Sequence, residues 1–86
     1  MLSSLKVLLI SRNRVSSLGT LPMLNTLVRL DISYNLISNL SKLQALTQLE
    51  ELDVSHNQIR DLAQFSNISQ SVSSLNCKGN PLPPMQ

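Results

Sequence analysis

The side chains best suited to catalysis in this 86-residue chain are its one histidine, His56, and the nearby Asp53 and Ser55. A serine, a histidine and a carboxylate can form a hydrolase centre, if the histidine reaches the nucleophile and a separate site stabilises the oxyanion. The serine recurs, however, two residues before an asparagine, at Ser11, Ser33 and Ser55. A repeated structural position explains this recurrence without catalysis. We therefore expect a protein that is not an enzyme.

Other site chemistries have little support in the composition. One cysteine, Cys77, and one histidine are too few for a zinc site, and the only glycines, Gly19 and Gly79, form no phosphate-binding loop. We expect no cofactor and no metal. A net charge of +2 is too small to indicate nucleic-acid binding. The apolar run at residues 7–10 is too short for a signal peptide or a membrane span.

The cysteine content also bears on the compartment. A small secreted domain would normally carry paired cysteines, and this chain has a single one. We expect a cytoplasmic protein, with a nuclear or cilium-associated and cytoskeletal location as the alternatives.

An internal repeat organises the chain. Asparagines recur in similar surroundings at intervals of 22, 22 and 23 residues, at Asn13, Asn35, Asn57 and Asn80. Between them, leucines follow one another in steps of three, which suit a 3-10 or short α-helical arc. The spacing then drops to two, which is the alternation of a β-strand. One repeat cannot bury its own leucines, so the repeats must stack and align their strands in a parallel sheet.

The register predicts one array with four repeats, at about residues 1–17, 18–39, 40–61 and 62–86. The strands should be centred near residues 8–10, 30–32, 52–54 and 75–77. Cys77 should be buried, because it occupies the inward position held by Ile10, Ile32 and Val54 in the earlier repeats. The inward set also includes Leu2, Leu21 and Leu24 early in the chain and, in the last repeat, Leu62, Phe65, Ile68, Val72, Leu75 and Leu82.

Each repeated asparagine follows a strand, where the chain turns and its backbone loses sheet partners. A side-chain amide can donate and accept hydrogen bonds at once. We expect the stacked amides to bond to the turns of their own and adjacent repeats, which satisfies backbone groups that would otherwise be buried unpaired.

The sequences Leu-Asp-Ile-Ser-Tyr-Asn (30–35) and Leu-Asp-Val-Ser-His-Asn (52–57), with a leucine at every third position before them, resemble the leucine-rich repeat superfamily. The period resembles the 22-residue subclass found in protein phosphatase 1 regulatory subunits and outer-arm dynein light chains. The resemblance implies an α/β solenoid with parallel strands on a concave face and short helical or 3-10 arcs on a convex face. Arrays of this kind usually carry capping elements, so we expect this chain to be a fragment or to lack full caps.

The resemblance implies a function in binding another protein on the strand face, as a scaffold or a regulatory subunit. The alternatives are a nucleoprotein subunit that binds a protein–RNA complex, and a phosphatase-regulatory or dynein-associated and ciliary light chain. No membrane partner is expected. A nucleic-acid partner is disfavoured because the side chains expected to point outward from the strands have a mixed to acidic charge.

The strand register also selects the outward residues. Arg29 should lie beside Glu51 and pair with it, and Val7 and Leu9 should be apolar at outward positions. These two form either a contact patch or surface that an N-terminal cap would cover. The residues expected to bind the partner lie on and just after the two middle strands: Arg29, Asp31, Tyr34, Glu51, Asp53 and His56.

Overall fold

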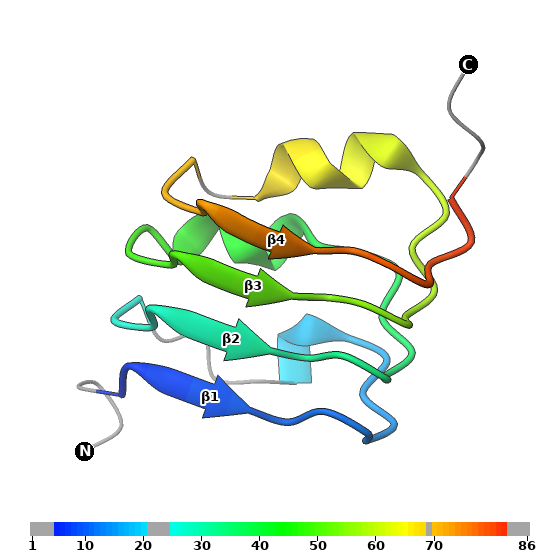
Figure 1. The fold of residues 1–86 in the computed structure, drawn as a ribbon, viewed down its shortest axis with the longest axis horizontal. Coiled ribbons are helices and arrows are strands. Elements are labelled where there is room, and N and C mark those ends of the chain that lie inside the picture. Colours follow the sequence, from blue (N-terminus) through cyan, green and yellow to red (C-terminus); the bar gives the residue numbers. More distant parts are fainter. Residues whose placement is uncertain (1–4, 21–24, 69, 83–86) are drawn as a thin grey trace.

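The computed structural model describes residues 5–20, 25–68 and 70–82, and these residues form one four-stranded parallel sheet. The strands lie side by side in chain order, and a short 3-10 arc follows each of the first three on the far side of the sheet (Figure 1). The expected α/β repeat architecture is therefore confirmed. The elements are β1 (Val7–Leu9), η2 (Leu18–Thr20), β2 (Arg29–Asp31), η3 (Ser41–Ala45), β3 (Glu51–Asp53), η4 (Leu62–Asn67) and β4 (Ser74–Asn76).

The sheet register joins equivalent positions of successive repeats. Leu8 pairs with Leu30, Leu30 with Leu52, and Leu52 with Leu75. The last of these steps spans one residue more than the others, and the register is nevertheless kept, so the additional residue is accommodated between β3 and β4. Because side chains alternate along a strand, the central leucine of each strand points to the arcs and the flanking residues point outward.

The arcs show why leucine recurs in steps of three. In the third repeat the backbone N–H of each leucine donates to the carbonyl of the leucine three residues earlier. The N···O distances are 3.0 Å for Leu43 to Leu40, 3.1 Å for Leu46 to Leu43 and 3.1 Å for Leu49 to Leu46. A 3-10 turn has three residues, so its period brings each leucine to the same side of the arc. All four side chains are fully buried.

The core lies between the sheet and the arcs, and its deepest part belongs to the two middle repeats. Its buried members are all leucine, isoleucine or valine, as expected for a layer that repeats. They are Leu18, Leu27, Leu30, Ile32, Ile37, Leu40, Leu43, Leu46, Leu49, Leu52, Val54 and Ile59.

The expected asparagine ladder is present. The Asn57 side-chain amide donates to the carbonyls of Val54 and Ser55 in its own turn and of Ile32 in the preceding repeat, at 2.9–3.1 Å. Its oxygen accepts the backbone N–H of Ile37 at 3.0 Å. Asn35 repeats this arrangement one repeat earlier. Each amide thus satisfies buried backbone groups in two adjacent turns, where an unpaired group would cost about 1–3 kcal/mol.

The prediction that Cys77 is buried is wrong. The thiol is only partly buried, and Leu75 and Leu62 in the same repeat are 42% and 44% exposed. Phe65, Ile68, Val72 and Leu82 pack against the core but are also only partly buried. The partly buried residues contact the core and Leu75 keeps its register with Leu52, so these positions point inward as predicted, whereas Leu62 is not among the residues that pack against the core. Their depth differs because each layer is covered by the next layer, and within the described residues no layer follows this one.

Three predicted core positions, Leu2, Leu21 and Leu24, lie outside the described residues.

Candidate functional site

The outward residues of the four strands form two rows across the sheet, which we call the strand face. Val7, Arg29, Glu51 and Ser74 form one row, and Leu9, Asp31, Asp53 and Asn76 form the other. Within the strand face, a shallow hollow of about 170 Å³ is bounded by β2, β3 and β4. Its lining includes every charged side chain of the two rows: Arg29, Asp31, Glu51 and Asp53.

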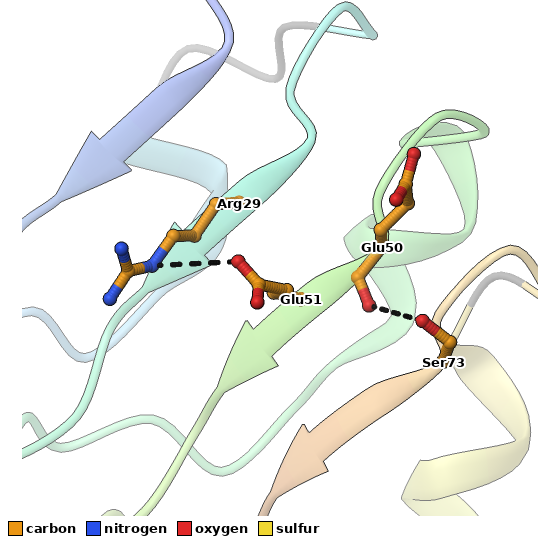
Figure 2. A network of polar contacts seen from close by, with 4 residues as sticks. All are labelled: Arg29, Glu50, Glu51 and Ser73. Carbon is orange, nitrogen blue, oxygen red and sulfur yellow. Dashed lines mark hydrogen bonds and ion pairs between the residues drawn. The ribbon is translucent and has the colours of Figure 1, made fainter.

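Arg29 and Glu51 pair across β2 and β3, as the register predicts. The Arg29 Nε lies 3.8 Å from the Glu51 Oε2, and the two side chains are 55% and 59% exposed. Figure 2 shows the Glu51 carboxylate directed at Arg29, whereas the side chain of Glu50 points away from both. The backbone carbonyl of Glu50 instead accepts a hydrogen bond from the Ser73 hydroxyl at 3.4 Å (Figure 2). A pair this exposed contributes about 0–1 kcal/mol, so the fold does not depend on either side chain.

The two aspartates also have a structural role, which was not predicted from the sequence. Asp53 Oδ1 accepts the backbone N–H of Ser55 at 3.0 Å and its hydroxyl at 2.6 Å. Asp31 makes the same two bonds to Ser33, at 3.0 and 2.7 Å. Each aspartate therefore closes the turn at the end of its strand with one carboxylate oxygen. The second oxygen of each carboxylate is not needed for that turn.

A stack of planar side chains runs along the strand ends. The Tyr34 and His56 rings lie nearly parallel, with centroids 4.3 Å apart and planes 11° apart. The Arg12 guanidinium carbon lies 4.2 Å above the centre of the Tyr34 ring on the other side. Gly79 occupies the equivalent position in the last repeat, and a Cβ there would overlap the His56 ring. We call this row, Arg12, Tyr34, His56 and Gly79, the strand-exit stack.

The backbone of the strand-exit stack is left-handed throughout. The φ angles are 60° at Arg12, 55° at Tyr34, 55° at His56 and 79° at Gly79. This conformation costs a non-glycine residue about 1–2 kcal/mol. Aromatic stacking contributes about 0.5–1.5 kcal/mol and an exposed cation–π contact about 0.5–1 kcal/mol. The side-chain stack therefore offsets a substantial part of the backbone strain.

Ser55, His56 and Asp53 are not arranged as a hydrolase centre. Ser55 is buried, and its hydroxyl donates to Asp53. His56 stacks on Tyr34, and no hydrogen bond in the described part of the chain joins its ring to Ser55 or Asp53. The three groups therefore have no relay from carboxylate to imidazole to hydroxyl.

The comparison with protein families agrees with this geometry. A family model described as leucine-rich repeats (two copies) matches residues 25–67, which is half of the chain. The chain belongs to the leucine-rich repeat family. Among the curated proteins, none matches it.

In this leucine-rich repeat chain, the six residues predicted to bind a partner divide into three kinds. Arg29 and Glu51 are exposed and form an ion pair with each other. Asp31 and Asp53 line the hollow and close turns, and Tyr34 and His56 belong to the strand-exit stack. The structure brings Arg29, Asp31, Glu51 and Asp53 together around one hollow.

The register places Arg12, Tyr34, His56 and Gly79 in one column, but their stacking, their left-handed backbone and the aspartate turns were not predicted from the sequence, although each leaves a signal there. The leucine-rich repeats place Asp two residues before Ser at both middle strands, which is the spacing of a side-chain-closed turn. Gly79 stands in the column of Arg12, Tyr34 and His56, and glycine favours a left-handed backbone.

Neither a membrane-spanning helix nor a metal-binding cluster is present in the described residues. No helix in residues 5–20, 25–68 or 70–82 of the leucine-rich repeat array is long and apolar enough to cross a membrane. The same residues contain no group of three or more histidine, cysteine or acidic side chains able to hold a metal ion.

Proposed function

We propose that this chain is a protein-interaction module that holds its partner on the strand face. Leucine-rich repeat domains generally mediate protein–protein interaction, which supports this class of function. The partner-binding residues in the proposal are those around the hollow and in the strand-exit stack: Arg29, Asp31, Tyr34, Glu51, Asp53 and His56.

One observation carries the proposal: the strand face holds exposed charged side chains that the fold does not use, on a backbone that is already fixed. Arg29 and Glu51 are more than half exposed, and their backbones lie in the central strands of the sheet. A surface that needs no ordering on binding avoids the entropic cost that flexible surfaces bear. Exposed side chains with no structural duty on such a frame are suited to recognition.

The structural role of each residue indicates how it would contribute to partner binding. Glu51 and Arg29 can exchange their weak mutual contact for contacts with a partner. Asp31 and Asp53 would offer the carboxylate oxygen that does not close the turn. Tyr34, 42% exposed, would offer the ring edge, because His56 and Arg12 cover the two ring faces.

The finer parts of the proposal rest on the sequence. The 22-residue period supports membership of the subclass that includes phosphatase regulatory subunits and dynein light chains. A scaffold or regulatory role in the cytoplasm follows from that subclass and from the single cysteine. A role in a nucleoprotein would require a basic surface, and the charged residues of the strand face are three carboxylates and one guanidinium.

The test selects binding partners and then measures how substitutions in the chain change their affinity. The immobilised chain would select binders from a displayed library of protein fragments, and the affinity of each binder would be measured by biolayer interferometry. The strand-face variant combines Arg29→Ala with Glu51→Ala, which keeps the net charge. We expect it to weaken binding about tenfold, or about 1.4 kcal/mol. Asp53 is left intact because its loss would open a turn.

The control variant combines Lys42→Ala in η3 with Gln48→Ala in the turn before β3, since both residues are exposed. Its affinity should match that of the unchanged chain. Binders that lose affinity with the control pair and keep it with the strand-face pair would show that the arcs carry recognition, and the proposal would be wrong.

A further inference from the structure

The strand face carries a charge opposite to that of the chain. Its outward rows contain three carboxylates, on Asp31, Glu51 and Asp53, and one cation, Arg29. The face is therefore net negative, although the chain as a whole has a net charge of +2. Opposite charge on a partner accelerates encounter and disfavours partners of the wrong sign. The partner that complements this face is cationic.

The carboxylates lie around a concave feature and not on a flat surface. They line the hollow of about 170 Å³, with Ser74 and Asn76 of β4 on its far side. The Arg29 guanidinium is held loosely, with its Nε 3.8 Å from Glu51 Oε2. A lysine or arginine from a partner would find two neutral polar groups and three carboxylates there. One carboxylate would remain in excess even while Arg29 stays paired with Glu51 and another neutralises the new cation.

The same two rows become apolar at β1. Val7 and Leu9 are 44% and 58% exposed, and they stand in the rows of Glu51 and Asp53 respectively, two strands away. Adjacent strands are about 4.7–4.9 Å apart, so the apolar pair and the acidic pair are separated by about 9–10 Å. A single short segment of a partner can span that distance.

The distance fits one backbone conformation well. A polyproline II segment rises about 3.1 Å per residue with three residues per turn, so side chains three residues apart share a face and lie about 9.3 Å apart. Such a segment forms no internal hydrogen bonds and presents preformed side chains at low entropic cost.

We propose that the strand face binds an extended basic segment of a partner protein, in which an apolar residue and a lysine or arginine are three positions apart. The apolar side chain contacts Val7 and Leu9, and the cation enters the hollow beside Glu51 and Asp53. This inference rests on the proposed function and specifies the chemistry of the partner.

The structure supplies a matched pair of variants for the test. Glu51→Lys and Glu50→Lys change the net charge equally at adjacent positions, but only the Glu51 side chain is directed across the strand face (Figure 2). The probes are two fluorescein-labelled synthetic peptides of identical composition, one with leucine and arginine three positions apart in a proline-rich segment, the other with them adjacent. Binding is followed by fluorescence anisotropy and by amide shifts of the isotope-labelled chain.

We expect the spaced peptide to bind more tightly than the adjacent one and to shift the amides of Leu9 and Asp53. Glu51→Lys should weaken its binding about fivefold to tenfold, because it removes an attraction and adds a repulsion, whereas Glu50→Lys should change it less than about twofold. Equal effects of the two variants would mean that binding depends only on the net charge of the chain. Equal affinities of the two peptides would mean that the three-residue spacing does not matter. Either result overturns the inference.

The fragments selected for the proposed function separate the two ideas. Fragments that depend on the strand-face pair Arg29 and Glu51 but are neutral or acidic would leave the proposed function standing and overturn the basic-segment inference. Fragments that do not depend on the strand face would overturn both. Enrichment of basic segments with the three-residue spacing would support both.

Discussion

Asn35 and Asn57, in the repeats of β2 and β3, are 4% and 3% exposed, whereas Asn13 is exposed and Asn80 is partly buried. All four occupy the same turn position. The strand leucines differ in the same way, since Leu30 and Leu52 are buried and Leu75 is 42% exposed. Equivalent positions of successive repeats therefore share the same register but differ in depth. The depth is set by whether a neighbouring repeat covers each side of the layer, as expected when stability is a sum of repeats and their interfaces.

The largest contrast between middle and end repeats should come from the asparagines. Asn57→Ala leaves the Ile37 N–H and several carbonyls unpaired in a buried turn, and we expect a loss of about 3–5 kcal/mol in the free energy of unfolding. Asn13→Ala removes bonds to Ile10 and Ser11 that water can replace, and should cost about 0.5–1 kcal/mol. Urea denaturation followed by circular dichroism measures both. Equal shifts of the two midpoints would contradict the contrast in depth.

A second contrast compares two leucines that pair across neighbouring strands. Leu52→Ala empties a fully covered position and should destabilise the chain by about 2–5 kcal/mol. Leu75→Ala removes a side chain that is already about half in water, so the expected cost is about 1 kcal/mol. The measurement is the same denaturation series. A Leu75 variant as damaging as the Leu52 variant would indicate that the last repeat is covered in solution.

The smallest expected effect tests whether an end repeat is coupled to the middle through the strand-exit stack. Gly79→Ala places a Cβ against the His56 ring on a backbone with φ of 79°, and we expect a loss of about 1–3 kcal/mol. The His56 ring proton shifts should move at the same time. The control is Gly19→Ala, whose Cβ would lie 3.3 Å from the Ser17 hydroxyl oxygen, with an expected change within about 0.5 kcal/mol. Unmoved His56 shifts in the Gly79 variant would show that the two residues are not in contact.

The strand register and the asparagine ladder could be predicted from the sequence because both follow from periodicity. The spacing that aligns Leu30 with Leu52 also fixes that Arg29 lies beside Glu51. The burial of Cys77 could not be predicted in this way. Periodicity says which way a side chain points, but its exposure depends on the layers above and below it.

The strand-exit stack shows a second limit of the sequence pattern. The parallel stacking of Tyr34 and His56 was not predicted, because it depends on a left-handed backbone at three non-glycine residues. That backbone is held by bonds between repeats, such as the Tyr34 N–H to the Ser55 carbonyl at 3.0 Å. Local propensity disfavours this conformation, so contacts between repeats override it.

The additional residue between β3 and β4 shows what determines the spacing of side chains across the sheet. Although the last interval is longer along the chain, Glu51 still pairs with Ser74 and Asp53 with Asn76. The separation of neighbouring side chains on the strand face is therefore fixed by backbone hydrogen bonding and not by the number of residues in a repeat. The spacing between side chains on adjacent strands is therefore constant along the array. Insertions between strands can accumulate during evolution, or be made by design, without changing the distances between the side chains that contact a partner.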